Sequence, residues 1–348
     1  MIKRRGAFDI GSGATKLQVS DIATGGVLLK TLFGEERPCA FGSDWLRSTD
    51  GCLSDAIQEK GIKTIEDLKL IGDELGVESY AVIATEVFRK AVNGHLFLDK
   101  VRSMGMTVTV VSQEIEAELG YATAVAYSNP GSQACIAWDS GGGSFQISTL
   151  SRGDSTCAEG ALAPVSDSMK LDMYMGSFGS GIATATLVET LQGRKLSEVL
   201  TPNPVSIADA DRLIDALMSK LDSNVPSWLL NVPDVVAIGG PNSIFQLACT
   251  VLSAMKKSSK NGVSTDASDV SSFTLGDVRS AIEECVDRSD QYLQKYLVFP
   301  NADPVTIVVP KLCLLYSVMK VTRIGKVKAV NCIGSCAGIL ITDRFYTP

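Results

Sequence analysis

Histidine is almost absent from this chain of 348 residues, which contains only His95. Triads with a histidine base, histidine-rich metal clusters and histidine–aspartate metal hydrolase sites are all hard to build around one imidazole. His95 follows Asn93 and Gly94 at an expected helix boundary, where surface capping is its simplest role. Any acid–base chemistry therefore has to fall on carboxylates, lysine or water.

Long hydrophobic runs are also missing. No apolar stretch reaches the roughly 20 residues that span a bilayer, and residues 1–5 lead into a strand without the apolar region of a secretory signal. We therefore expect a cytoplasmic protein with no membrane contact. The 39 acidic and 32 basic residues give a net charge of −7, which disfavours a nucleic-acid partner.

The nine cysteines contain no Cys-x-x-Cys pair. Cys332 and Cys336 flank three residues, but they have no histidine partner that would indicate a zinc site. Cysteines in apolar segments, such as Cys135 and Cys249, are expected to pack as small hydrophobes.

A glycine-rich stretch, in contrast, occurs twice. Residues 137–146 read Ala-Trp-Asp-Ser-Gly-Gly-Gly-Ser-Phe-Gln, and residues 7–14 read Ala-Phe-Asp-Ile-Gly-Ser-Gly-Ala. An aspartate where a strand opens into glycines can hold a divalent cation, while backbone N–H groups approach phosphate without interference from Cβ atoms. A single copy could be a plain hairpin turn. Two copies indicate two similar domains that each offer a loop to one phosphate-bearing ligand.

Strands and helices are expected to alternate along the chain. Strands are predicted at 6–10, 14–21, 27–33, 79–84, 107–111, 134–138, 145–150, 156–161, 235–238 and 327–330. Helices are predicted at 54–75, 112–127, 165–173, 182–191, 207–221, 244–255, 275–296 and 305–321, with a further helix opening within 84–91 and a short last one. Residues 34–50 and 256–272 are predicted loops.

This order describes an α/β protein of the actin/Hsp70/sugar-kinase architecture. We expect two RNase H-like (actin-like ATPase) domains with mixed five-stranded sheets flanked by helices, and an active site in the cleft between them. Domain I is predicted at residues 1–125 with a C-terminal helix at 337–348, and domain II at 126–336.

Several charged residues have a purely structural explanation beside a functional one. Ser112 is the expected N-cap of its helix, and Glu114 and Glu116 in the first turns would favour the helix dipole. Arg89 could be a solvated helix charge.

Four stretches, in the same order, resemble motifs of the exopolyphosphatase and guanosine pentaphosphate phosphohydrolase family (Ppx/GppA). They are residues 8–16, residues 84–91 (Ala-Thr-Glu-Val-Phe-Arg-Lys-Ala), residues 112–121 and residues 139–144 (Asp-Ser-Gly-Gly-Gly-Ser). The resemblance covers nearly the whole chain and implies the short form, without the HD-like C-terminal domain of longer members.

The resemblance also implies roles for individual residues. Glu116 would activate the attacking water, Arg89 would bind the terminal phosphate, and Asp139, with Asp9 and Gln146, would hold Mg²⁺ or Mn²⁺. The implied phosphate-binding residues are Gly11, Ser12, Gly13, Lys16, Gly141, Gly142, Gly143 and Ser144. The implied partners are inorganic polyphosphate or guanosine penta- and tetraphosphate, and a homodimer is left open.

Three positions depart from the family pattern. Gln146 stands where a glutamate is usual and brings no charge to a metal, and Lys16 replaces a bidentate arginine by a point charge. The glycine motif at 334–338 lacks the arginine and glutamate that usually follow it. Gln146 and Lys16 favour one alternative to a phosphohydrolase, a sensor that binds polyphosphate or an alarmone and turns it over poorly. Asp9 and the Gly239-Gly240 junction allow another, an ATP-dependent sugar or acetate-type kinase.

Overall fold

The computed structural model describes residues 1–128, 135–151, 170–221, 223–230, 232, 234–259, 270–297 and 303–346. The chain divides into two compact units: unit 1, residues 1–175 with 332–348, and unit 2, residues 176–331. The strands form two mixed sheets, one of five and one of six strands. The predicted α/β class is confirmed, with one strand more than expected in the second sheet. The predicted domain bounds remain a prediction.

The five-stranded sheet belongs to unit 1 and has the order β3-β2-β1-β4-β5. Its strands are β1 (Ile2–Ile10), β2 (Ala14–Ala23), β3 (Val27–Pro38), β4 (Ser79–Ala84) and β5 (Thr107–Val110). β1, β2 and β3 form an antiparallel meander, whereas β4 runs parallel to both β1 and β5. The chain therefore leaves β1, β4 and β5 at the same edge of the sheet.

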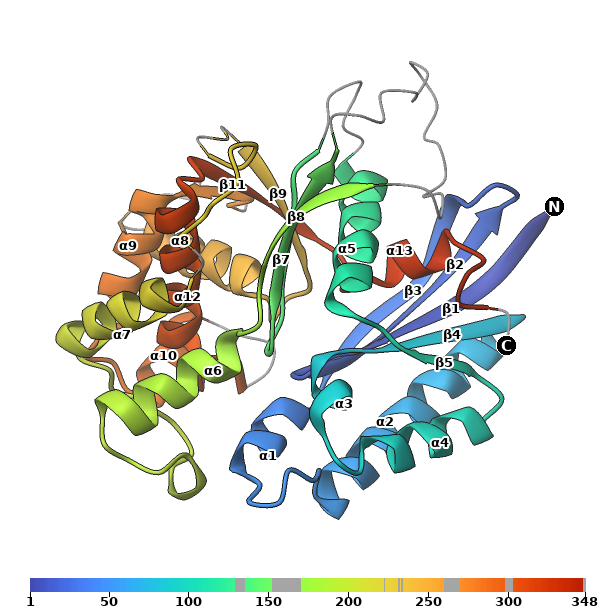
Figure 1. Cartoon of the computed structure of the whole chain (residues 1–348), viewed down its shortest axis with the longest axis horizontal. Coiled ribbons are helices and arrows are strands. Elements are labelled where there is room, and N and C mark those ends of the chain that lie inside the picture. Colours follow the sequence, from blue (N-terminus) through green and yellow to red (C-terminus); the bar gives the residue numbers. More distant parts are fainter. Residues whose placement is uncertain are drawn as a thin grey trace. The chain divides into compact units, whose positions relative to one another are not determined.

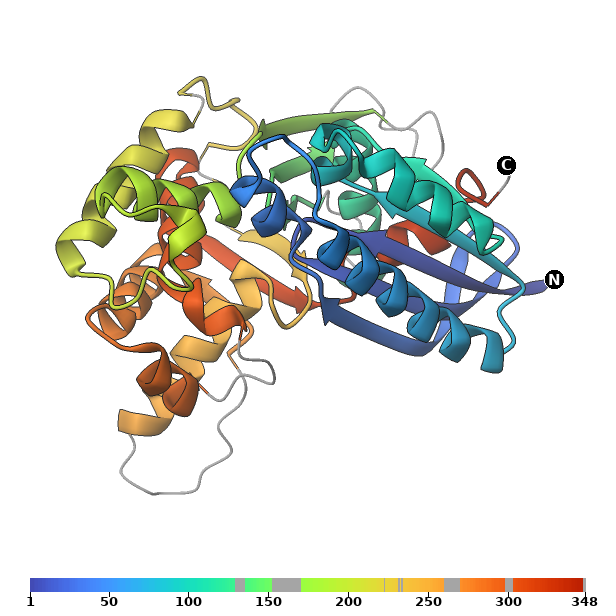
Figure 2. The ribbon, with the colours of Figure 1, turned by 90° about the horizontal axis from the view of Figure 1, so that it is seen from below.

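Helices cover both faces of this sheet (Figures 1 and 2). α2 (Asp55–Glu74) and α4 (Gly94–Ser103) lie on one face, and α5 (Gln113–Ser128) and α13 (Cys336–Leu340) lie on the other. Successive side chains of a strand point to opposite faces. Phe8 and Ile10 of β1 accordingly enter the first core, and Ala7 enters the second. Asp9 therefore points to the face that carries α5 and α13.

Unit 1 contains further strands outside this sheet. β6 (Ala137–Ser140) and β7 (Phe145–Leu150) form an antiparallel hairpin that packs against α5, and β8 (Leu171–Gly176) follows. Two short helices, α1 (Phe41–Arg47) and α3 (Glu86–Lys90), complete the described elements of this unit.

Unit 2 is mainly helical. β9 (Asp234–Gly239) runs parallel to β11 (Lys326–Asn331), which pairs antiparallel with β10 (Ser272–Thr274). The helices are α6 (Ser180–Ala185), a π-helical turn (Thr186–Leu191), a 3₁₀ turn (Leu196–Glu198), α7 (Ile207–Lys220), α8 (Ile244–Ser259), α9 (Leu275–Cys285), α10 (Asp290–Leu297), α11 (Asp303–Thr306) and α12 (Val308–Thr322). α12 is buried at most positions and packs against α7, α8 and α9, so it is the central helix of this unit.

Two predicted elements are wrong in their extent because tertiary contacts override local patterns. The loop expected at 34–50 contains the end of β3, which pairs with β2 as far as Pro38, and α1, which is anchored by the fully buried Phe41. The single helix expected at 275–296 breaks between α9 and α10. Asp287 there has φ +58°, a left-handed conformation that cannot continue an α-helix.

Further corrections concern residues 165–173 and the C-terminus. Residue 170 is neither helix nor strand, and residues 171–173 belong to strand β8 and not to a helix. Residues 165–169 of that prediction and the strand expected at 156–161 lie outside the described residues. The C-terminal helix ends at Leu340, far short of residue 348. The guanidinium of Arg5 donates to the carbonyls of Leu340 and Thr342, both at 3.2 Å, and so satisfies the end of this short helix.

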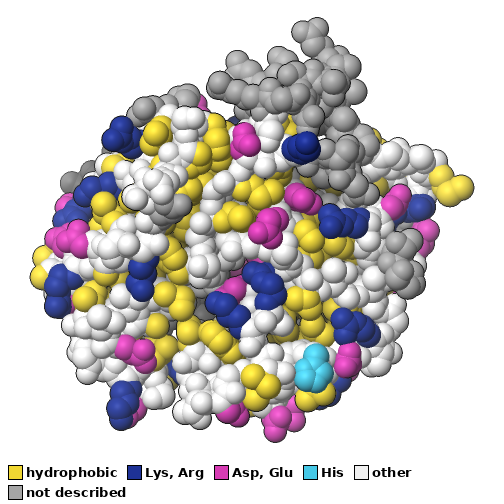
Figure 3. Space-filling view, in the orientation of Figure 1, with side chains coloured by type: hydrophobic (Ala, Val, Ile, Leu, Met, Phe, Trp, Pro, Cys, Tyr) yellow, Lys and Arg dark blue, Asp and Glu magenta, His cyan; other side chains and the backbone are white. Residues whose placement is uncertain are grey.

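Two further features of the described residues are the length of their helices and the distribution of charged side chains on their surface. None of the helices in the described parts of the chain is long and apolar enough to cross a bilayer. On the face shown in Figure 3, acidic and basic side chains of the described residues are interspersed.

Candidate active site

The predicted site residues lie on four connections of unit 1 or in the strands and helices that flank these connections. Three of these connections leave the carboxyl edge of the five-stranded sheet: residues 11–13 after β1, residues 85–89 after β4, and residues 111–116 after β5. The fourth is the turn of the β6–β7 hairpin, residues 141–144. Ligands of open α/β sheets bind beyond the carboxyl ends of parallel strands, so this edge is the candidate site.

The two glycine stretches form the same turn. The N–H of Gly11 donates to the carbonyl of Ala14 at 2.9 Å, and the N–H of Gly141 donates to the carbonyl of Ser144 at 2.9 Å. Asp9 pairs with Lys16 across the first hairpin, and Asp139 pairs with Gln146 across the second. The repeat therefore makes Lys16 and Gln146 equivalent. Because the Gly11 and Gly141 N–H groups close the turns, other groups of these loops would have to meet a phosphate.

The remaining glycines of the loops have different causes. A Cβ at Gly143 would lie 2.0 Å from Oε2 of Glu86, and one at Gly142 would lie 3.2 Å from Cβ of Ser12. Packing therefore accounts for these two glycines. A Cβ at Gly13 would meet no described atom within 4 Å, and its φ is not left-handed. Packing does not explain Gly13, and its open surroundings leave its backbone free for close approach by a ligand.

Asp9 and Asp139, one from each copy, are connected through Ser335. Oδ2 of Asp9 accepts the N–H of Ser335 at 3.2 Å, and Oδ2 of Asp139 accepts the Ser335 hydroxyl at 3.3 Å. Nζ of Lys16 lies 3.1 Å from Oδ2 of Asp9. Gly334 has φ +51°, and a Cβ there would lie 2.4 Å from that same oxygen. The motif at 334–338 therefore belongs to the site, although its sequence did not identify Ser335 as a site residue.

The cluster of Asp9, Asp139 and Lys16 contains more acidic than basic side chains. Burial lowers the pKa of Lys16, but Asp9, Glu36 and Asp139 outweigh it and raise that pKa above its ordinary value, so Lys16 stays protonated. The pKa of Asp139 is raised to about 6. Burial is the main cause and Asp9 adds to the rise, while Lys16 opposes it. Two acidic groups thus share one ammonium group.

This donor set suits Mg²⁺. The ion typically takes one or two carboxylates and completes its shell with water and substrate phosphate oxygens. Asp139 and Gln146 are direct cross-strand partners, so their side chains share one face of the hairpin. The amide nitrogen of Gln146 donates to the Ser144 hydroxyl at 3.0 Å, which leaves its carbonyl as a neutral oxygen donor. The described residues contain no group of three or more His, Cys, Asp or Glu side chains that could hold a metal.

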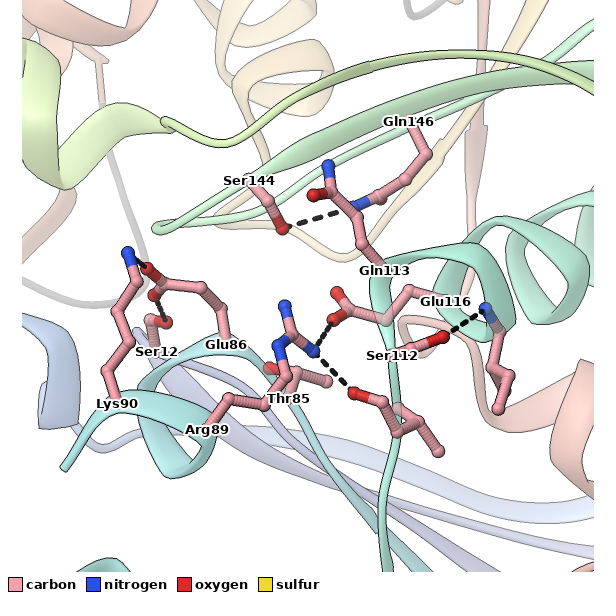
Figure 4. Close-up of polar contacts among 12 residues, drawn as sticks. Ser12, Thr85, Glu86, Arg89, Lys90, Ser112, Gln113, Glu116, Ser144 and Gln146 are labelled. Atoms are coloured by element: carbon pink, nitrogen blue, oxygen red, sulfur yellow. Dashed lines mark hydrogen bonds and ion pairs between the residues drawn. The ribbon is translucent and has the colours of Figure 1, made fainter. Parts of the chain in front are cut away.

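Arg89 and Glu116, predicted from separate motifs, meet in the structure (Figure 4). Nη1 of Arg89 forms a close ion pair with Oε1 of Glu116 and also donates to the carbonyl of Val111 at 2.5 Å. Arg89 is therefore not a freely solvated helix charge. Glu116 is 8% exposed. Burial raises its pKa to about 7; Arg89 lowers this pKa, and Asp139 and Asp9 raise it.

Glu86 is a further acidic residue near the loops, and no sequence motif identified it as a site residue. Its carboxylate forms an ion pair with Lys90 and accepts the Ser12 hydroxyl at 3.2 Å. Figure 4 shows Glu86 beside Ser12, on the side of Arg89 away from Glu116. It occupies a variable position of the Ala-Thr-x-x-x-Arg stretch, so the motif did not single it out.

Part of the chain matches a known protein family. Residues 19–161 match the model of the Ppx/GppA phosphatase family. The predicted resemblance to that family is confirmed. The match includes the motifs at 84–91, 112–121 and 139–144, and it begins after the first glycine motif. Among curated proteins, none matches this sequence.

Solved structures extend the likeness to the whole chain. A Ppx/GppA family member from Aquifex aeolicus has 19% identity and a TM-score of 0.68, with 99% of this chain and 98% of that chain covered. An exopolyphosphatase from Cytophaga hutchinsonii has 16% identity and a TM-score of 0.70, with 97% and 96% covered. At such identities the likeness concerns the fold, and it supports the predicted actin-like architecture of Ppx/GppA proteins.

Proposed function

We propose that this protein is a metal-dependent phosphohydrolase that releases the terminal phosphate of inorganic polyphosphate or of guanosine pentaphosphate. The observation that carries the proposal is the ion pair between Arg89 and the buried Glu116, at the sheet edge that also holds the glycine loops. A general base works best when its pKa is near the working pH, and the pKa of Glu116 is raised to about 7.

In the proposed reaction, ionised Glu116 accepts a proton from water as the water oxygen attacks the terminal phosphorus. The bond from that phosphorus to the bridging oxygen breaks, and the shortened chain leaves with the bridging oxygen. A guanidinium carries five N–H donors, and both described contacts of Arg89 use Nη1. The other nitrogens of Arg89 are thus suited to bind the terminal phosphate. The backbone of Gly13, which has no side chain, can be approached closely by the polyphosphate chain.

Mg²⁺ (or Mn²⁺) is the proposed cofactor, with Asp9, Asp139 and the amide oxygen of Gln146 as its protein ligands. When bound, it would neutralise charge on the phosphate oxygens. The deficit of positive charge around Asp9 and Asp139 supports this assignment.

The test is phosphate release from polyphosphates of several lengths, guanosine pentaphosphate and ATP, each with Mg²⁺. Glu116→Gln removes the base, and we expect it to lower the rate by about two to four orders of magnitude. Glu114→Gln, on the first turn of the same helix, is the matched control and should retain activity. If no substrate yields phosphate above the level of Glu116→Gln, the proposed hydrolase is wrong.

A sensor that binds polyphosphate or an alarmone with little turnover is the second candidate. The observation in its favour is the neutral Gln146 opposite Asp139, with its amide nitrogen committed to Ser144. Tight, Mg²⁺-insensitive binding in calorimetry without phosphate release would support the sensor, and lack of binding would exclude it.

A further inference from the structure

Glu86 lies in contact with both glycine loops of unit 1. Its Oε2 accepts a hydrogen bond from the Ser12 hydroxyl in the first loop. In the second loop, Gly143 lies so close to the same oxygen that a Cβ would come within 2.0 Å. The two loops also touch each other, because a Cβ at Gly142 would lie 3.2 Å from that of Ser12. The carboxylate of Glu86 is therefore held where the loops converge.

Lys90 holds this carboxylate from the other side. Lys90 and Glu86 form an i, i+4 ion pair on α3, and the Lys90 ammonium also lies 5.5 Å from the ring centre of Trp45. Glu86 is 9% exposed, whereas the side chain of Lys90 is 40% exposed. A partly buried carboxylate is therefore fixed by one hydroxyl and one ammonium at the loops that are proposed to receive phosphate.

An anion in this place has a direct consequence for phosphate. The Ser12 hydroxyl can donate its one hydrogen either to Glu86 or to a phosphate oxygen. In a water-poor site, two like charges side by side repel each other strongly. A phosphate group that enters between the loops must therefore displace the carboxylate or bind against its charge.

We propose that Glu86 is a specificity-determining residue that competes with phosphate for the site between the two glycine loops. This inference rests on the proposed phosphate site and adds a residue at a variable position of the family motif. Lys90 moderates the competition because its ammonium offsets the charge of Glu86. A protein with both Glu86 and Lys90 should then bind metal-free phosphate chains less tightly than one without the Glu86 charge. A protein with Glu86 but without the Lys90 charge should bind them less tightly still.

The first experiment measures tripolyphosphate binding by calorimetry in EDTA, so that no divalent cation contributes. Glu86→Gln keeps the shape of the side chain and removes its charge, and we expect it to bind about 10- to 100-fold more tightly than the unchanged protein. Glu74→Gln is the matched control: it removes the same charge from the exposed end of α2, just before β4 begins, and should leave binding unchanged. Equal or weaker binding by Glu86→Gln overturns the inference.

Lys90→Met provides a second test, made at a residue whose side chain is 40% exposed. We expect it to weaken tripolyphosphate binding about tenfold when Glu86 is present and much less in the Glu86→Gln background. An equal loss in both backgrounds would mean that Lys90 acts on the ligand directly, and it would overturn its proposed role. If neither the unchanged protein nor any variant binds tripolyphosphate, the phosphate site itself is wrong. Equal binding by all variants rejects only the role of Glu86.

Discussion

The guanidinium of Arg89 forms an ion pair with the carboxylate of Glu116. The residue proposed to bind the terminal phosphate is therefore electrostatically coupled to the proposed base. Burial and the two aspartates keep the pKa of Glu116 high, and Arg89 is the group that lowers it. A change at Arg89 must therefore alter the pH at which Glu116 can accept a proton.

The first prediction is a pH-dependent rate. Because only ionised Glu116 can accept a proton, kcat/KM should rise with pH up to a pKa of about 7 and then level off. Arg89→Met removes the charge that lowers this pKa, so the rising limb should move to higher pH while the plateau falls. A pH–rate series for both proteins measures the two midpoints. Identical midpoints would mean that the limb does not report the Arg89–Glu116 pair.

The second prediction concerns the stability of the Asp9–Lys16 pair. Removing one partner of a buried ion pair leaves the other charge uncompensated and costs about 3–5 kcal/mol. Lys16→Met should therefore lower the urea midpoint strongly, because Asp9 and Asp139 lose their shared ammonium. Adding Asp9→Asn should restore part of the loss. A double variant no more stable than Lys16→Met would argue against coupling between the two residues.

The third prediction separates the glycines of the two loops. Gly13→Ala should leave the free energy of unfolding unchanged or raise it by about 0.4–1 kcal/mol, because a methyl group fits there without contact. The same change should weaken tripolyphosphate binding. Gly143→Ala should instead lower stability, because its methyl group meets Glu86, and this loss should shrink in a Glu86→Ala background. Unaltered binding by Gly13→Ala would show that no ligand approaches this backbone.

The parts of the site that the sequence predicted are those set by short stretches of chain. Each glycine motif holds its aspartate, its turn and the residue seven positions later in one short stretch, so these residues could be named from the sequence. The structure then pairs them across the hairpins as Asp9–Lys16 and Asp139–Gln146. Ser335 could not be found this way. It reaches Asp9 from 326 positions away, which only the packing of α13 against the sheet brings about.

Glu86 shows a second limit of sequence-based prediction. Its motif position is variable, and its meaning comes from two loops that converge on it in space. The break between α9 and α10 has a similar origin, since one left-handed residue, Asp287, interrupts an otherwise continuous helical pattern.

The last prediction restores the charge that Gln146 lacks. Gln146→Glu would place a carboxylate directly opposite Asp139 on the same face of the hairpin. Because Mg²⁺ prefers charged oxygen ligands, we expect affinity for Mg²⁺, measured by calorimetry, to rise about tenfold, and phosphate release at low Mg²⁺ to rise with it. The added charge is buried, so the variant should be less stable without Mg²⁺ and regain stability when the ion is added. Gln146→Leu is the control, and it should bind Mg²⁺ less well than the unchanged protein. A Gln146→Glu variant with unaltered affinity for Mg²⁺ would place the metal elsewhere and leave Gln146 as a partner of Ser144 only.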